Sequence, residues 1–103
     1  MSRIDQLQQM LKDEPHDSFL NYALALEHAK ANDIPKAIGI IEEIILRDEN
    51  YLGAYYQLGK LYEETGDPAK AIATYQKGIE IAKKQNNRKA QGELNEALWM
   101  LED

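Results

Sequence analysis

The residues that could support acid–base or metal chemistry are few and poorly arranged for it. Glu63 and Glu64 are adjacent, and adjacent side chains on a helix point about 100° apart, so these carboxylates cannot act as a pair on one substrate. His16 and His28 lack HExxH spacing and a neighbouring carboxylate triad, so we predict no metal site. The chain also lacks Walker and GxSxG motifs. We therefore predict a protein that is not an enzyme and that uses no cofactor.

Charge and cysteine content narrow the chemistry further. The absence of cysteine excludes disulfides, thiol nucleophiles and cysteine-based zinc sites. A single basic cluster could contact phosphate or RNA, with Tyr75 nearby in sequence as a stacking residue; it consists of Lys83, Lys84, Arg88 and Lys89. The net charge of -6 opposes nonspecific nucleic-acid binding, and lysines at the end of a helix complement its dipole. We therefore favour a structural role for this cluster over a nucleic-acid partner.

Length and hydropathy indicate one soluble domain. The chain has 103 residues, of which 44% are hydrophobic and 29% are charged, as expected for one elongated core spanning residues 1–103. No apolar run reaches the roughly 18 residues that suggest a membrane span, and the first residues lack the apolar region of a secretory signal. We therefore predict a cytoplasmic protein without a membrane partner.

The centre of the chain is a predicted helical hairpin. Apolar and small residues recur at helical spacing on both sides of Gly66 and Asp67; these residues are Tyr55, Leu58, Gly59, Tyr62, Ala71, Ile72, Tyr75 and Ile79. Gly66 can adopt the left-handed conformation that ends a helix, Asp67 can cap the next one, and Pro68 fits its first position. Gly59 and Gly78 inside the two helices predict close packing.

The hairpin repeats at an offset of 34 residues, which places Leu58 on Leu24, Asp67 on Asp33 and Ala71 on Ala37. The period and the order of aromatic, Leu, small residue and Tyr resemble the tetratricopeptide repeat (TPR) family, and the whole chain looks like the small stand-alone TPR proteins of bacteria. The resemblance implies an all-α fold, an α-solenoid of two TPR hairpins with an N-terminal half-repeat helix and a C-terminal capping helix. The expected segments are a helix at 2–14, repeats at 18–51 and 52–85, and a cap at 88–101.

Several residues at the predicted helix ends should set the boundaries. Asn32 tolerates the left-handed turn, and Asp33 should cap the next helix as Asp67 does. We also expect Asn50 to cap the helix that follows it. The last helix does not fit the repeat, and we interpret it as a solvating cap that covers the end of the solenoid.

The resemblance implies a non-enzymatic interaction module whose first helix in each hairpin lines a concave groove. The groove would take an apolar peptide or an amphipathic helix; its predicted residues are Phe19, Tyr22, Leu26, Tyr56, Lys60 and Glu63. The alternative is that the first helix or the cap covers them as core. Capture of a C-terminal carboxylate, the family's best-defined mode, is disfavoured because Tyr22 and Leu26 occupy its Lys and Asn slots and Gln57 replaces a second Asn.

Trp99 lies at the margin of the apolar stripe of the last helix. Such a residue more often packs against the preceding helix than anchors a partner, and we favour packing. The expected partner is a protein or peptide of unknown identity. The alternative is a homodimer that buries the groove or the Trp99 edge.

Overall fold

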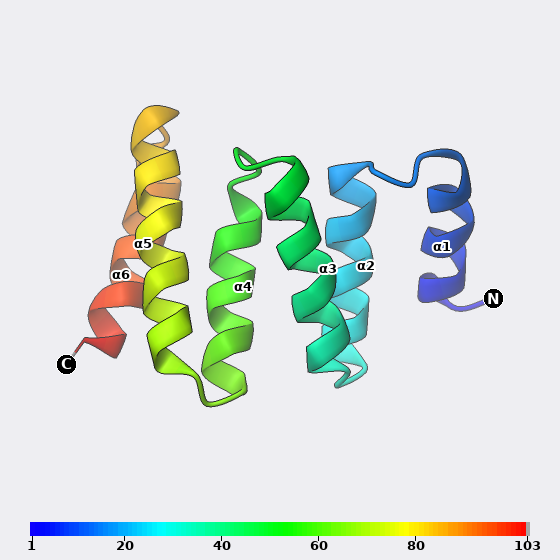
Figure 1. Ribbon diagram of the computed structural model, residues 1–103, viewed down its shortest axis with the longest axis horizontal. Helices are drawn as coiled ribbons and strands as arrows, with labels where there is room; N and C mark the ends of the chain where they lie inside the picture. Colours follow the sequence, from blue (N-terminus) through cyan, green and yellow to red (C-terminus); the bar gives the residue numbers. More distant parts are fainter. Residues whose placement is uncertain (103) are drawn as a thin grey trace. The chain divides into compact units, whose positions relative to one another are not determined.

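The computed structural model describes residues 1–102, and within them the chain forms six helices and no strand (Figure 1). The helices are α1 (Arg3–Asp13), α2 (Ser18–Lys30), α3 (Ile34–Arg47), α4 (Gly53–Glu64), α5 (Pro68–Lys84) and α6 (Arg88–Leu101). None of the helices in the described part is long and apolar enough to cross a membrane.

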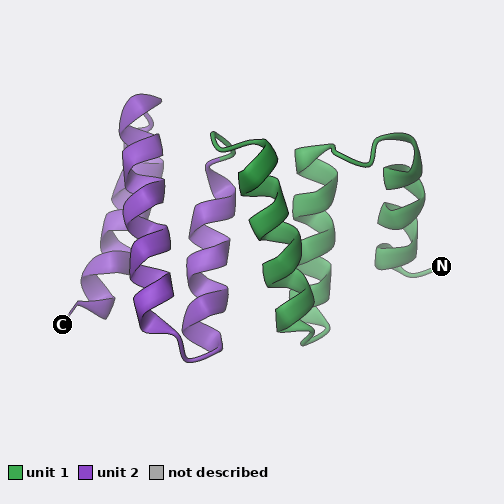
Figure 2. Ribbon diagram, in the orientation of Figure 1, with its two compact units in different colours: residues 1–51 green, residues 52–103 purple. Residues whose placement is uncertain are grey.

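The helices form two compact units (Figure 2). Unit 1 covers Met1–Tyr51 and contains α1 to α3, with α2 packed against both α1 and α3. Unit 2 covers Leu52–Asp103 and contains α4 to α6, with α5 packed against both α4 and α6. The middle helix of each unit therefore has two helical neighbours, while the outer helices each keep a face that does not pack on it. The expectation of one domain over 1–103 stays a prediction.

Three of the connections use the same turn. Asn32, Gly66 and Asn86 have φ values of 66°, 76° and 56°, which is the left-handed conformation that Gly and Asn tolerate best. At the Gly66 turn, Gly66 N donates to Glu63 O at 3.1 Å and Asp67 N donates to Tyr62 O at 2.9 Å. The other two turns repeat this pair of bonds, which satisfies carbonyls that a helix end would otherwise leave unpaired. The predicted left-handed roles of Asn32 and Gly66 are confirmed.

Side-chain caps begin four of the six helices. Ser2 and Asp5 form a capping box at α1, and Asp17, Asp67 and Asn87 cap α2, α5 and α6. The role predicted for Asp67 is confirmed, with its Oδ1 3.2 Å from the N–H of Lys70, and Pro68 is the first residue of α5.

Two predicted caps are wrong. Asp33 occupies the N-cap position of α3, but its side chain makes no capping bond. Asn50 does not cap α4: the N-cap position is Leu52, which already has helical dihedral angles and no side-chain cap. The reason is a turn, closed by a bond from Tyr51 N to Asp48 O, which ends before the helix starts at Gly53.

Small residues let the helices of each unit approach closely. In unit 1, Ala25 of α2 and Ala37 of α3 are fully buried. In unit 2, a Cβ added to Gly59 would lie 2.2 Å from Cε1 of Tyr75, and one added to Gly78 would lie 2.7 Å from Cβ of Tyr55. The predicted packing role of both glycines is confirmed, because any side chain at either position would overlap a neighbouring helix.

Candidate functional site

The predicted groove residues of unit 1 lie on α2. The side chain of Phe19 is 64% exposed, whereas Tyr22 and Leu26 are half-buried. The Tyr22 ring packs against Tyr51, with 5.4 Å between ring centroids and a 56° angle between ring planes. Burial and the nearby Tyr22, Asp17 and Asp48 raise the pKa of the Tyr51 hydroxyl. Unit 1 therefore presents one exposed aromatic ring beside a half-buried one.

The predicted groove residues of unit 2 lie on α4 and are half-buried. The Lys60 ammonium lies 5.4 Å from the centroid of the Tyr56 ring, within the range of a cation–π interaction. Glu63 accepts a hydrogen bond from the hydroxyl of Tyr75. Each of the two charged groups on this face is therefore held by an aromatic side chain of its own unit.

Tyr75 belongs to the core that supports this face. Its side chain is fully buried, and its ring centroid is 6.3 Å from that of Tyr56. Burial and the bond to Glu63 raise the pKa of its hydroxyl above the ordinary value. The suggestion that Tyr75 could stack on a nucleic-acid base is wrong, because the repeat places this residue where α4 and α5 cross and no base could reach it.

Two hollows lie between α4 and α6. One, of about 160 Å³, is lined by Leu52, Gly53, Tyr56, Asn87, Ala90, Glu93 and Leu94. The other, of about 290 Å³, is lined by Tyr56, Lys60, Glu93, Glu96, Ala97 and Met100. Tyr56 and Glu93 line both hollows, and we call the two hollows together the α4–α6 groove. The capping helix thus borders the face of α4 and leaves open space beside it.

The sequence interpretation missed the α6 side of this groove because α6 does not fit the repeat. A signal was present in its spacing: Glu93, Glu96, Ala97 and Met100 follow i, i+3, i+4 and i+7, which places them on one helical face. Ala97 is buried and Met100 is 68% exposed. This face therefore has an apolar base with carboxylates and a thioether at its rim.

The packing predicted for Trp99 is wrong. Its side chain is 74% exposed, because the buried residues of α6 are Leu94 and Ala97 and Trp99 follows Ala97 by two positions, about 200° around the helix. The edge of α6 thus presents a large aromatic side chain to solvent.

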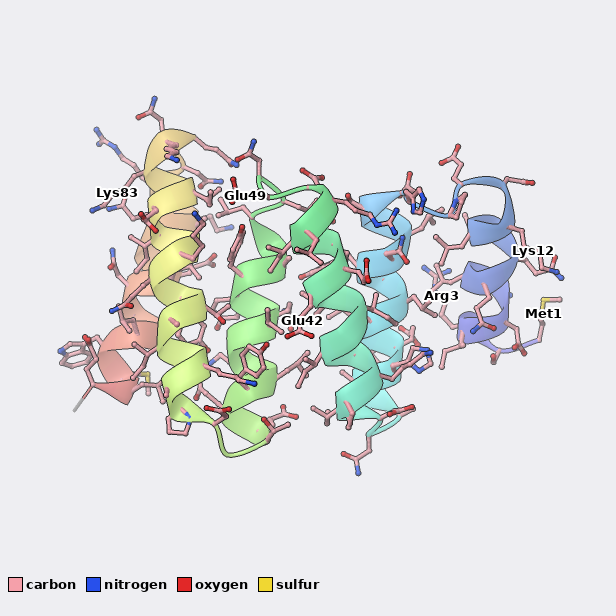
Figure 3. All side chains as sticks on the ribbon, viewed as in Figure 1. Met1, Arg3, Lys12, Glu42, Glu49 and Lys83 are labelled. Atoms are coloured by element: carbon pink, nitrogen blue, oxygen red, sulfur yellow. The ribbon has the colours of Figure 1, made fainter. Side chains whose placement is uncertain are left out.

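The basic cluster of unit 2 does not line the α4–α6 groove, and both histidines belong to unit 1. Lys83, Lys84, Arg88 and Lys89 are exposed around the turn between α5 and α6, and Figure 3 shows Lys83 projecting outward from the end of α5. His16 contacts the guanidinium of Arg47. His28 is a residue of α2, and its Nε2 is buried and, among the described residues, has no hydrogen-bond partner. No group of three or more potential ligands in residues 1–102 could hold a metal ion.

Comparison with known proteins places these observations in a family. Residues 52–85 match the model of the tetratricopeptide repeat. A crystal structure of a tetratricopeptide repeat domain protein from Salinibacter ruber is 42% identical over 84% of this chain and 96% of its own, with a TM-score of 0.79. A solution structure from the same organism is also 42% identical, covers 86% and 90% of the two chains, and has a TM-score of 0.83.

A more distant solved structure shares the fold. The TPR2B domain of yeast Sti1, in complex with pHsp70, is 21% identical over 96% of this chain and 79% of its own, with a TM-score of 0.88. No curated protein matches the chain. The predicted all-α fold of the TPR solenoid class is confirmed. TPR domains are generally non-enzymatic protein–protein interaction modules. From the repeat, the helices and the Salinibacter likeness together, the chain belongs to the tetratricopeptide repeat family.

Proposed function

We infer that this protein is a non-enzymatic adaptor that binds a peptide or a helix of another protein through the exposed faces of α2 and α4. The binding residues we propose are those predicted from the repeat, namely Phe19, Tyr22, Leu26, Tyr56, Lys60 and Glu63. The observation that carries this proposal is the accessibility of aromatic side chains at these positions. Phe19 is exposed, and Tyr56 lines open space rather than a filled core.

The energetic reason is the cost of leaving such residues in water. Burying a Phe side chain contributes about 1.5–3 kcal/mol, and aromatic residues are enriched among those that dominate binding energy. Most of the Phe19 side chain stays exposed within the described part of the chain, so a partner that covers it would gain most of this burial energy. The pHsp70 complex of the Sti1 domain supports a protein or peptide as the class of partner.

The proposal is tested by affinity capture with wild type beside a Phe19→Ser, Tyr56→Ala double variant. We expect a partner that wild type recovers to be lost with the double variant. The control is Leu46→Ser, which removes an 81% exposed apolar side chain from α3, outside the proposed residues. Circular dichroism melting shows whether each variant is folded. Equal recovery by all three proteins would defeat the assignment of these faces.

A second candidate function is self-association through the edge of α6. It is favoured by one observation, the 74% exposure of Trp99, because surface aromatics of this size are typical of interfaces. Sedimentation velocity across a concentration series tests it, with Trp99→Ser as the variant expected to shift the protein toward monomer. A wild-type protein that remains monomeric throughout the series would exclude it.

A further inference from the structure

We propose that α6 is the second wall of the binding face of α4, and that the α4–α6 groove takes a segment of another protein that carries Lys or Arg beside an apolar side chain. This inference rests on the proposed function, since it names the chemical class of the partner. It also assigns binding roles to Glu93, Glu96 and Met100, three residues of the helix predicted to serve only as a cap.

The shape of the groove favours a side chain with an apolar stem. Its walls are Tyr56 and Lys60 from α4 and one face of α6, and the larger of its two hollows is about 290 Å³, enough for one or two side chains. Ala97 is buried and lines this hollow together with both carboxylates. Met100 is 68% exposed at its end, and a flexible thioether adapts its shape to an apolar neighbour.

The charged residues of the α4–α6 groove favour a positively charged partner. Glu93 and Glu96 are exposed, and neither forms an ion pair with another residue of the described part. Within residues 1–102, Lys60 is the one cation that lines the groove, and it lies over the Tyr56 ring. A Lys or Arg of the partner would meet two carboxylates without competing for them, whereas an acidic segment would meet uncompensated like charge. The net charge of -6 also attracts a positively charged segment.

The test uses two fluorescein-labelled amphipathic peptides that share one stripe of leucine and alanine and carry either lysine or glutamate elsewhere. Fluorescence anisotropy should show that wild type binds the lysine peptide more tightly. Because each exposed ion pair is worth only a fraction of a kcal/mol, Glu93→Gln together with Glu96→Gln should weaken lysine-peptide binding about three- to tenfold. Amide NMR shifts of Lys60 and Glu96 should move when the lysine peptide is added.

A matched control separates the groove from net charge. Glu64→Gln with Glu80→Gln removes the same two charges from exposed positions of unit 2 that do not line the groove, and it should leave affinity within about twofold of wild type. Equal weakening in both double variants would overturn the role of the groove. Equal or tighter binding of the glutamate peptide, or no binding of the lysine peptide, would overturn the charge assignment. The adaptor function is judged separately, by capture with the Phe19→Ser, Tyr56→Ala variant.

Discussion

Replacing Gly59 with alanine tests the packing that supports the α4 face. The added Cβ would lie 2.2, 2.6 and 2.7 Å from Cε1, Cζ and Cδ1 of Tyr75, all far inside normal contact. The ring has little freedom to move away, because Tyr75 is fully buried, donates to Glu63 and packs near Tyr56. The overlap must therefore be relieved by separating α4 from α5 or by displacing the ring from its hydrogen bond.

The net change in the free energy of unfolding combines two destabilising terms and one stabilising term. Overpacking a core costs about 1–3 kcal/mol, and loss of the Tyr75 hydrogen bond costs about 0.5–1.5 kcal/mol. Alanine regains about 1 kcal/mol of helix propensity over glycine. We therefore expect Gly59→Ala to lower the free energy of unfolding by about 2 kcal/mol. The normal advantage of alanine in a helix is outweighed because the contact involves a rigid ring rather than a flexible chain end.

Urea unfolding followed by circular dichroism measures this change, with Gly92→Ala as the matched control. A Cβ at Gly92 of α6 meets nothing within 4 Å, so this control should gain up to about 1 kcal/mol. Adding Tyr75→Leu to Gly59→Ala should restore part of the lost stability, giving a double variant more stable than the sum of the single changes predicts. A Gly59→Ala protein as stable as the Gly92→Ala protein would refute the packing argument.

Two further predictions concern a helix cap and the response to alkaline pH. Asp67→Ala should lower the free energy of unfolding by about 1 kcal/mol because it removes the cap of α5. Asp33→Ala should lower it by less because Asp33 makes no capping bond. Thermal melts compare the two variants, and equal losses of stability would contradict the cap assignment. Because folding raises the pKa of Tyr75, the protonated form of its hydroxyl stabilises the fold. This contribution to the free energy of unfolding is complete below about pH 10 and is lost as the pH rises further, by at most about 1.4 kcal/mol per pH unit. Urea unfolding between about pH 8 and pH 11 should therefore show a shallower loss of stability for Tyr75→Phe than for wild type, and identical slopes would disprove the shift.

The predicted fold class was correct because its signals are dense and redundant. The 34-residue offset and the apolar stripes act together over whole helices, and α6 spans the residues expected of the last helix. The caps were less predictable. Asp33 and Asp67 share a type and a place in the repeat, yet only Asp67 makes a capping bond, because a capping bond depends on where the side chain lies and the repeat pattern does not specify that.

The candidate site was harder to predict than the fold. The positions on α2 and α4 followed from the repeat, and their role as a binding face stays a proposal. The α6 side of the groove was missed because α6 departs from the repeat, and the pattern therefore did not assign it a place beside α4. The exposure of Trp99 was also missed. A residue at the margin of the apolar stripe of a helix is buried or exposed according to which element packs against that margin.

By itself, the sequence determined the helices, the left-handed turns at Asn32 and Gly66 and the close approach at Gly59 and Gly78. These features depend on interactions between residues near in the chain or on a period repeated along it. Only the tertiary structure decided that Tyr75 is closed to any ligand, that Trp99 is open to solvent, and that α6 borders the face of α4. Such outcomes depend on which helical faces meet, and the apolar pattern of one helix does not specify its partner when that helix lies outside the repeat.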